Sequence, residues 1–146
     1  MIKSSHDIII RSYENKDEGA VISLWKACNL IRPWNNPERD ILRKSKVNGE
    51  LFLVGLINDK IIASVMGGYE GHRGWVNYLA VDPSYRKKGI ARKIMSEIEA
   101  KLLSIGCPKV NLQVRAENTE AMAFYEKIGY GKDNVVSYGK RLIEDG

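Results

Sequence analysis

The most informative part of the chain is Val81-Asp82-Pro83-Ser84-Tyr85-Arg86-Lys87-Lys88-Gly89-Ile90-Ala91. A strand-like segment, 75–81, leads into it, and apolar residues with helical spacing follow it, namely Ile90, Ile94, Ile98, Leu102 and Ile105. A strand therefore turns directly into a long amphipathic helix. Free backbone amides and the positive end of the helix dipole meet at such a turn, and glycine lets an anion approach the main chain. The turn predicts a pyrophosphate site, with a simple helix-capping glycine as the alternative.

The segments after this turn predict a parallel crossover. The helix should end at Gly106, with Pro108 beyond it, and residues 110–115 alternate between apolar and polar side chains as a half-buried strand does. A strand, a helix and a strand in this order favour a right-handed parallel βαβ unit. Ligands of open α/β sheets bind beyond the carboxyl ends of the strands, where the strand order breaks. We therefore expect the ligand at the end of the 75–81 strand.

The first half of the chain predicts two helices and an antiparallel meander. Asn36 followed by Pro37 is a typical N-cap and first-turn pair, which starts the second helix. The expected elements are a strand at 8–13, a helix at 21–28, a helix from Pro37 to about Lys44, strands at 51–57, 61–66 and 75–81, a turn at 58–60 and a glycine-rich loop before the last strand.

The end of the chain predicts one more helix and one more strand. Asn118 should cap a helix that Gly129 ends, and residues 135–142 should close the sheet. The whole pattern predicts an α/β fold of the α+β type. Its mixed sheet joins an antiparallel meander to a parallel βαβ unit, in a single domain over residues 1–146.

Composition agrees with one ordinary globular domain. The chain has 146 residues, of which 44% are hydrophobic and 28% charged, which excludes disordered, collagen-like and coiled-coil classes. Its two cysteines and two histidines, Cys28, Cys107, His6 and His72, are far apart, so neither zinc-ligand spacing nor a disulfide framework emerges and no metal is expected. No apolar run is long enough for a signal peptide or a membrane span, so we expect a cytoplasmic protein.

Positive charge is concentrated around the informative turn. The net charge is +5, and residues 83–109 carry seven basic side chains against two acidic ones. Such a cluster indicates an anionic partner, which could be nucleic acid, a membrane surface or a phosphorylated small molecule, and the alternative is a solvated helix face. The P-loop, dinucleotide and G-x-S-x-G signatures are all missing from the sequence, so kinase, dinucleotide and hydrolase interpretations lose their main support.

Two motifs resemble those of one enzyme family. Arg86-Lys87-Lys88-Gly89-Ile90-Ala91 is similar to the R/Q-x-x-G-x-G/A signature of the GCN5-related N-acetyltransferases, the GNAT family. Asn118, Ala121 and Phe124-Tyr125-Glu126-Lys127-Ile128-Gly129-Tyr130 resemble the family's downstream motif, so the resemblance covers most of the chain. The segment 67–74, Gly-Gly-Tyr-Glu-Gly-His-Arg-Gly, suggests a little-characterised bacterial branch of this family, for which the resemblance implies no substrate.

The resemblance implies acetyl-CoA as cosubstrate, splayed central strands and a role for each motif residue. Tyr125 would protonate the departing thiolate, and Asn118 would hydrogen-bond the cosubstrate. Their separation of seven residues corresponds to about two helical turns, roughly 10.5 Å along one face. For Tyr125 the alternative is a core aromatic beside Phe124. The other implied binding residues are Leu79, Ala80 and Val81, whose backbone pairs with the pantetheine arm, Lys87, Lys88, Gly89, Ile90, Ala91 and Arg92, whose amides bind the pyrophosphate, and Arg86 and Lys87, which add charge.

The implied reaction is direct attack of an amine on the thioester. Related ribosomal-protein N-terminal acetyltransferases carry a glutamate base where this chain has Gln113, which cannot accept a proton. The candidate replacements are His72, Glu70 and Glu117, and for His72 the alternative is an ordinary surface residue of the glycine-rich loop. The residues that could line the acceptor pocket are Trp34, Arg32 and Arg73, and for Trp34 packing between helix and loop is an equal alternative. Cys107 as an acyl-accepting nucleophile is the weaker alternative, because it has no paired histidine.

We therefore expect an N-acetyltransferase whose acceptor is a small-molecule or peptide amine, with no nucleic-acid or membrane partner. A homodimer is left open. Two other classes of protein fit the sequence less well. A basic nucleic-acid-binding domain would interleave aromatic residues with its positive charge, and a catalytically silent acyl-CoA-binding module would not need both Tyr125 and Asn118.

Overall fold

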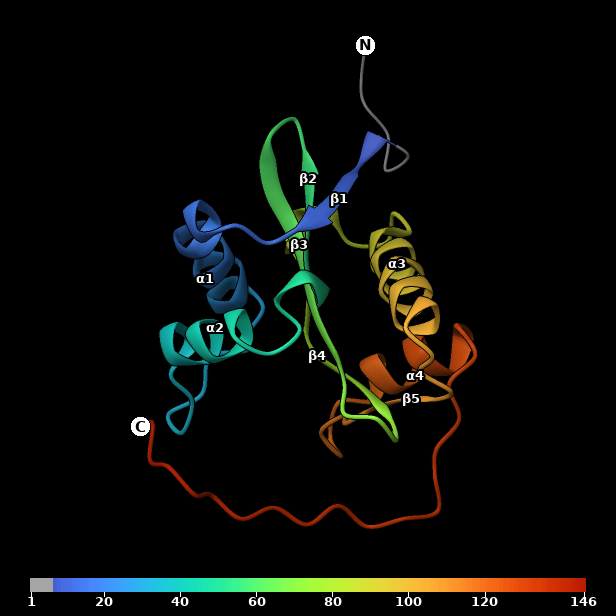
Figure 1. Ribbon diagram of the computed structural model, residues 1–146. Coiled ribbons are helices and arrows are strands. Elements are labelled where there is room, and N and C mark those ends of the chain that lie inside the picture. The colour runs from blue at the N-terminus through green and yellow to red at the C-terminus, as the bar shows by residue number, and fades with distance from the viewer. Residues whose placement is uncertain (1–6) are drawn as a thin grey trace.

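The computed structural model describes residues 7–146, so the first six positions of the expected domain, with His6, lie outside the described residues. The chain folds as a mixed sheet with helices on both faces (Figure 1). The strands are β1 (Ile9–Ser12), β2 (Phe52–Ile57), β3 (Lys60–Tyr69), β4 (Gly74–Val81) and β5 (Val110–Leu112). The helices are α1 (Glu18–Ala27), α2 (Pro37–Ser45), α3 (Ile90–Ser104) and α4 (Thr119–Lys127), with short 3₁₀ turns η2 (Asn15–Asp17), η3 (Gly49–Leu51) and η4 (Pro83–Tyr85).

The sheet has the predicted antiparallel and parallel parts. The strand order is β1-β2-β3-β4-β5, and all neighbours are antiparallel except β4 and β5. The parallel pairing covers only Gly74–Val76 against Val110–Leu112. The rest of β4, Asn77–Val81, has β3 on one side and, among residues 7–146, no strand on the other. The expected splay of the two central strands is therefore confirmed.

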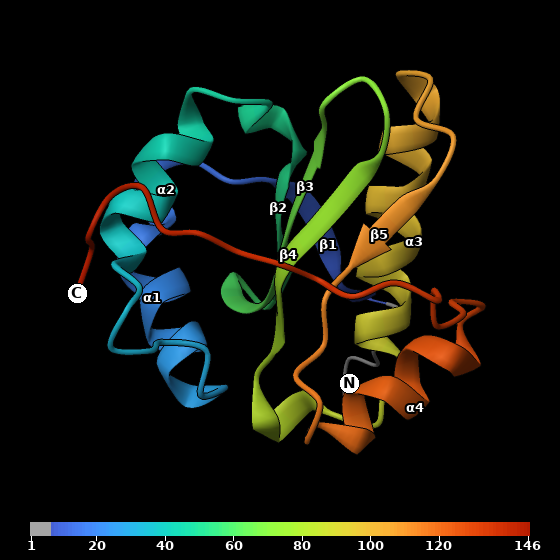
Figure 2. The same ribbon diagram turned by 90° about the horizontal axis from the view of Figure 1, so that it is seen from below.

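Two apolar layers hold the helices to the sheet. Helices α1 and α2 cover one face, and α3 and α4 cover the other (Figures 1 and 2). On the α1 side, Trp25 and Phe52 are fully buried. On the α3 side, four of the five residues of the predicted helical stripe are buried in one row, Ile90, Ile94, Ile98 and Leu102, with Met95 beside it. The fifth, Ile105, is 48% exposed because it is the C-cap beyond the last turn of the helix.

The helix starts follow from the capping residues that the sequence indicated. The Asn36 side chain accepts a hydrogen bond from the Arg39 amide (3.0 Å), and Pro37 is the first residue of α2. Gly89 is the N-cap of α3, with a left-handed φ of 78° that an L side chain rarely adopts. Asn118 caps α4 by accepting from the Ala121 amide (3.1 Å).

The glycine-rich loop is shorter than expected. Gly67 and Gly68 belong to β3, and Gly74 starts β4, so only residues 70–73 form the turn. The reason is close packing of the sheet on α3, because a Cβ at Gly67 would lie 2.6 Å from Cγ1 of Ile98. Gly67 is a glycine because the strand and the helix approach closely there. The sequence alone cannot distinguish such a glycine from one in a loop.

We expect Gly67→Ala to destabilise the fold by about 1–3 kcal/mol, since the new methyl group must displace the buried Ile98 side chain. Gly68→Ala is a matched control one residue away, because its Cβ would meet only the Lys44 ammonium at 3.7 Å. Urea denaturation of the two variants measures the difference. Equal urea midpoints for the two variants would show that β3 and α3 can move apart to accommodate the methyl group, and would contradict this expectation.

Strand β4 has a bulge within its free edge. Tyr78 has a left-handed φ of 52°, and it stands with Leu79 opposite the single residue Val65. A buried hydrogen-bond chain fixes this bulge: the Trp25 indole N–H donates to Ser64 Oγ (2.9 Å), and the Ser64 hydroxyl donates to the Tyr78 carbonyl (2.9 Å). The Trp25 and Tyr78 rings also stack, with centroids 3.8 Å apart. The path of β4 at its splayed end is thus set from α1 and β3.

The prediction that residues 135–142 close the sheet is wrong. Residues 131–146, which we name the C-terminal strap, contain no strand and run from the end of α4 across the molecule towards α2 (Figures 1 and 2). Val136 and Tyr138 are 81% and 92% exposed. The ends of the strap explain its path: Asp133 pairs with Lys109 (3.0 Å) at one end and Asp145 with α2 at the other, so the segment crosses the sheet instead of following β5.

Candidate functional site

The turn before α3 has the geometry of an anion site. Lys87 and Gly89 both have positive φ, and a Cβ at Gly89 would meet no atom within 4 Å, so the main chain is open there. The Lys93 amide donates to the Gly89 carbonyl (3.1 Å), which leaves the earlier amides, of Ile90, Ala91 and Arg92, as the donors that a helix start directs outward. Lys87, Lys88 and Arg92 are exposed around them, and the first turn of α3 has no acidic residue. These residues fit a pyrophosphate.

Arg86 ties this turn to the end of β4. Its Nε donates to the Val81 carbonyl (3.2 Å), so part of the guanidinium serves the fold and the rest is exposed. Asp82 shapes the intervening 3₁₀ turn by accepting from the Ser84 amide (2.9 Å). The strand end and the anion site are therefore held together.

The free edge of β4 fits an extended chain. Ala80 and Val81 pair with Ser64 and Ala63 of β3, and their other edge faces the gap where β5 has separated. Leu79 is half-buried and packs with Ala91 and Tyr125 against the buried cluster that contains Val81 and Ile90. Leu79, Val81, the start of α3 and Tyr125 thus border one apolar cluster, whereas Ala80 faces the cluster on the α1 side.

Tyr125 lies in an apolar environment on α4. Its ring contacts Phe124 and Tyr130 edge-on, with centroids 5.2 and 5.8 Å away. Burial raises the pKa of Tyr125 to about 12, so the phenol keeps its proton at neutral pH. Asn118 uses its side-chain oxygen in the helix cap, which leaves its NH₂ group as a donor.

The candidate bases differ in their exposure and in the hydrogen bonds that they already make. Glu70 is exposed, and its carboxylate accepts the His72 and Arg73 amides, which lowers its pKa and ties it to the β3–β4 turn. His72 is exposed in the same turn, and Glu117 is exposed before α4. Gln113, also exposed, donates to the hydroxyl of Ser137 in the C-terminal strap. Cys107 is buried and donates to the Lys109 carbonyl (3.4 Å).

Two contacts near the acceptor side were not predicted from the sequence. The Arg115 guanidinium lies 5.2 Å from the centre of the Trp34 ring, so the chain after β5 meets the α1–α2 loop. The Tyr78 hydroxyl donates to Asp40 of α2 (2.6 Å). Neither pair has a signal in local spacing, because its members are far apart in the chain. Arg32 is half-buried in the α1–α2 loop, and Arg73 in the β3–β4 turn.

Residues 7–146 contain neither a candidate membrane-spanning helix nor a candidate metal site. No helix in residues 7–146 is both long and apolar enough to cross a membrane. Within the same range, no three His, Cys, Asp or Glu side chains gather as a metal site would require.

Comparisons with known proteins agree with this geometry. A family model described as the acetyltransferase (GNAT) family matches residues 19–130. A protein named acetyltransferase from Pectobacterium atrosepticum is 49% identical over 136 residues, which are 93% of this chain and 96% of that protein.

Solved structures share the fold. The ribosomal-protein-S18-alanine N-acetyltransferase from Escherichia coli superposes with a TM-score of 0.72 at 23% identity, over 86% of this chain and 79% of that one. AAC(6')-Iy, solved with the bisubstrate analogue CoA-S-monomethyl-acetylneamine, gives a TM-score of 0.74 at 16% identity, over 92% of this chain and 99% of that one.

Proposed function

The chain belongs to the acetyltransferase (GNAT) family, and on that premise we propose that it transfers the acetyl group of acetyl-CoA to the amine of a small molecule or a peptide. It is an acyltransferase. The observation that carries the proposal is the open anion site at Gly89 beside the unpaired edge of β4. We also propose that residues 1–146 form one domain around this site.

The residues at the turn and the strand end bind the cosubstrate in this proposal. Acetyl-CoA supplies a thioester and a pyrophosphate. The amides of residues 87–92 donate to the pyrophosphate, with charge added by Arg86 and Lys87. The free backbone edge of Leu79–Val81 pairs with the pantetheine arm, and a backbone N–H there polarises the thioester carbonyl. The Asn118 NH₂ group donates a further hydrogen bond.

Tyr125 acts as the general acid in this proposal. The attacking amine forms the new C–N bond as the C–S bond breaks, and the Tyr125 hydroxyl gives its proton to the leaving sulfur. A pKa of about 12 keeps that proton in place throughout the neutral range. The amine loses its own proton to water or to a loop residue, since Gln113 cannot accept it.

The missing carboxylate at Gln113 favours a weakly basic acceptor. Holding a lysine side chain neutral at pH 7 costs about 4.6 kcal/mol, whereas an α-amine costs only about 1 to 1.4 kcal/mol. Two proteins with the same fold are linked to acceptors of different kinds. One is a ribosomal-protein-S18-alanine N-acetyltransferase, and the other was solved with a CoA–acetylneamine bisubstrate analogue. We propose an α-amine or another weakly basic amine in preference to protein lysine.

A screen of amines, amino acids and short peptides with acetyl-CoA, read by thiol release, tests this function. We expect catalytic efficiency to be higher for α-amines than for lysine ε-amines at pH 7. The rate should rise with pH through the pKa of the bound amine and stay high to about pH 10, because Tyr125 remains protonated. His72→Ala should leave the rise in place if water is the base. A lysine ε-amine that reacts faster at pH 7 than every α-amine would overturn the acceptor assignment.

A further inference from the structure

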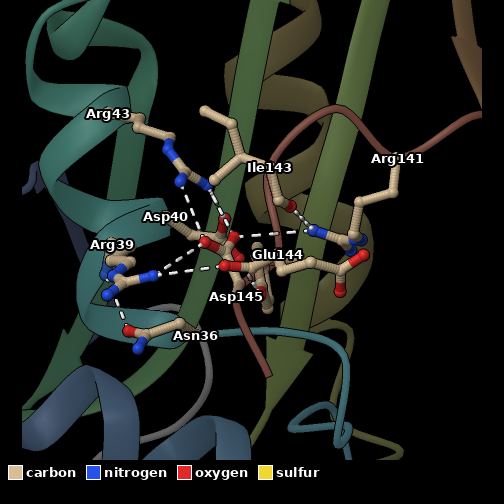
Figure 3. A network of polar contacts seen from close by, with 9 residues as sticks. Asn36, Arg39, Asp40, Arg43, Arg141, Ile143, Glu144 and Asp145 are labelled. Carbon is tan, nitrogen blue, oxygen red and sulfur yellow. Dashed lines mark hydrogen bonds and ion pairs between the residues drawn. The ribbon is translucent and has the colours of Figure 1, made fainter.

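The C-terminal strap ends in a carboxylate held by arginines. The Asp145 side chain is only 2% exposed, and Arg43 of α2 binds both of its oxygens (2.7 and 2.9 Å; Figure 3). Arg39, one turn earlier on α2, contacts the same group at 3.3 Å, and Arg141 of the strap lies at 3.5 Å. The planar guanidinium of Arg43 matches a carboxylate in the two-point geometry that arginine favours.

Most of the strap is loosely attached. Its apolar residues face solvent, including Val135, Val136, Tyr138 and Leu142. At its far end, Gly146 packs so closely on the α1–α2 loop that a Cβ there would overlap the Pro33 carbonyl oxygen. The last two residues therefore hold the end of the strap on α2 and the α1–α2 loop, while the exposed apolar residues before them have little to lose on release.

The strap lies over the acceptor side of the proposed transfer site. Arg43 pairs with Asp40 (3.7 Å), and Asp40 accepts the Tyr78 hydroxyl (2.6 Å), so the arginine pair is linked to β4 directly before Leu79. At the other side of the splay, Ser137 of the strap contacts Gln113, which follows β5. The strap thus runs from the side of β5 to α2 and passes in front of β4 in the view of Figure 2.

We propose that Arg39 and Arg43 form the binding site for a carboxylate on the acceptor, and that Asp145 occupies this site when the acceptor is absent. The acceptor is then an amine that also carries a carboxylate, such as an amino acid or an acidic peptide. This substrate class rests on the acetyl transfer proposed above. The presence of a carboxylate-binding site on α2 does not depend on that proposed function.

The strap is a competitor that an acceptor can displace. Asp145 is tethered, so its effective concentration at the arginines is of millimolar order, as for other short flexible linkers. Arg43 lowers the pKa of Asp145 to about 2, so the carboxylate is ionised and bound through the neutral range, and the contact is lost only as the pH falls towards that value. Acceptors therefore compete with the strap at every pH at which amines react.

The binding part is tested without any acetyl transfer. The full-length Asp145→Asn variant empties the site with little change in shape, and the probe is a peptide with the sequence of residues 141–146. We expect calorimetry to show binding of this peptide that is at least about ten-fold tighter than that of the same peptide with Asn in place of Asp. Adding Arg43→Gln should abolish the difference. Equal binding of the two peptides, or no binding, would overturn the site.

The acceptor part is tested by kinetics on amino acids and dipeptides, each paired with its carboxamide. Asp145→Asn should lower KM for the carboxylate-bearing member by about ten-fold and leave the amide nearly unchanged. Gly146→Ala, which displaces the strap end but keeps every charge, should do the same. Glu144→Gln is the matched control, because among the described residues no cation pairs with its side chain, and it should change neither KM.

The outcomes separate the two proposals. If no amine is acetylated, the proposed function fails, while the peptide experiment still decides the carboxylate site. If amines are acetylated but free acids and amides respond equally to Asp145→Asn, the strap does not compete with the acceptor and this inference is wrong.

Discussion

Tyr125→Phe should lower kcat by about 100- to 10,000-fold, the usual range for removing a general acid. The effect falls on kcat because the hydroxyl is needed when charge develops on sulfur, whereas the ring that packs on Phe124 and Tyr130 is retained. Affinity for CoA, measured by thermal shift or calorimetry, should change little. Single-turnover acetylation with the best acceptor from the screen measures the chemical step.

Tyr130→Phe provides the matched control for this change. Tyr130 contacts the Tyr125 ring, and its hydroxyl donates to Glu99 of α3 (2.6 Å), so its removal should cost stability, about 1–3 kcal/mol, and little turnover. Equal losses of turnover in the two variants would assign Tyr125 to the core. Unchanged turnover in Tyr125→Phe would do so as well.

Gly89→Glu should abolish CoA binding. The new side chain and negative charge would stand where the pyrophosphate must lie, on a residue whose φ of 78° suits glycine. CoA at one hundred times its dissociation constant should stabilise the parent protein by about 2.7 kcal/mol. In the variant this stabilisation should vanish, as a thermal melt with and without CoA would show.

The control for Gly89→Glu lies at the other end of the same helix. Gly106 follows α3 with a φ of 90°, and a Cβ there would meet no atom within 4 Å, so Gly106→Glu carries the same backbone strain and charge away from the anion site. It should lower the melting temperature and keep the response to CoA. If CoA raises the melting temperature of Gly89→Glu as much as that of the parent, the cosubstrate site is elsewhere.

Features that depend on neighbouring residues could be predicted from the sequence. The buried stripe of α3 and the caps at Asn36, Gly89 and Asn118 were predicted correctly, because helical spacing and capping act within one or two turns. The anion site was predicted for the same reason, since a glycine and its basic neighbours adjoin the helix start. The strand–helix–strand order also predicted the parallel pairing of β4 and β5.

Features that depend on distant residues could not be predicted. Gly67 belongs to a strand because Ile98 packs over it, and the strap leaves the sheet because Asp145 binds Arg43, 102 positions earlier. The apolar residues Val135, Val136, Tyr138 and Leu142 suggested a strand over 135–142, but two ion pairs determine where that segment lies. The bulge at Tyr78 likewise depends on Trp25 and Ser64, which no local pattern links to it.

The buried chain from Trp25 through Ser64 to Tyr78 is the part of the protein that tolerates substitution least. Substituting Ser64 by an apolar residue would leave the Trp25 indole N–H and the Tyr78 carbonyl without their hydrogen-bond partner, so such a variant loses the contacts that fix the bulge in β4. The α1–α2 loop and the strap carry no comparable constraint over most of their length. A library aimed at a new acceptor should therefore randomise residues 31–35 and 134–144 and hold these three positions fixed.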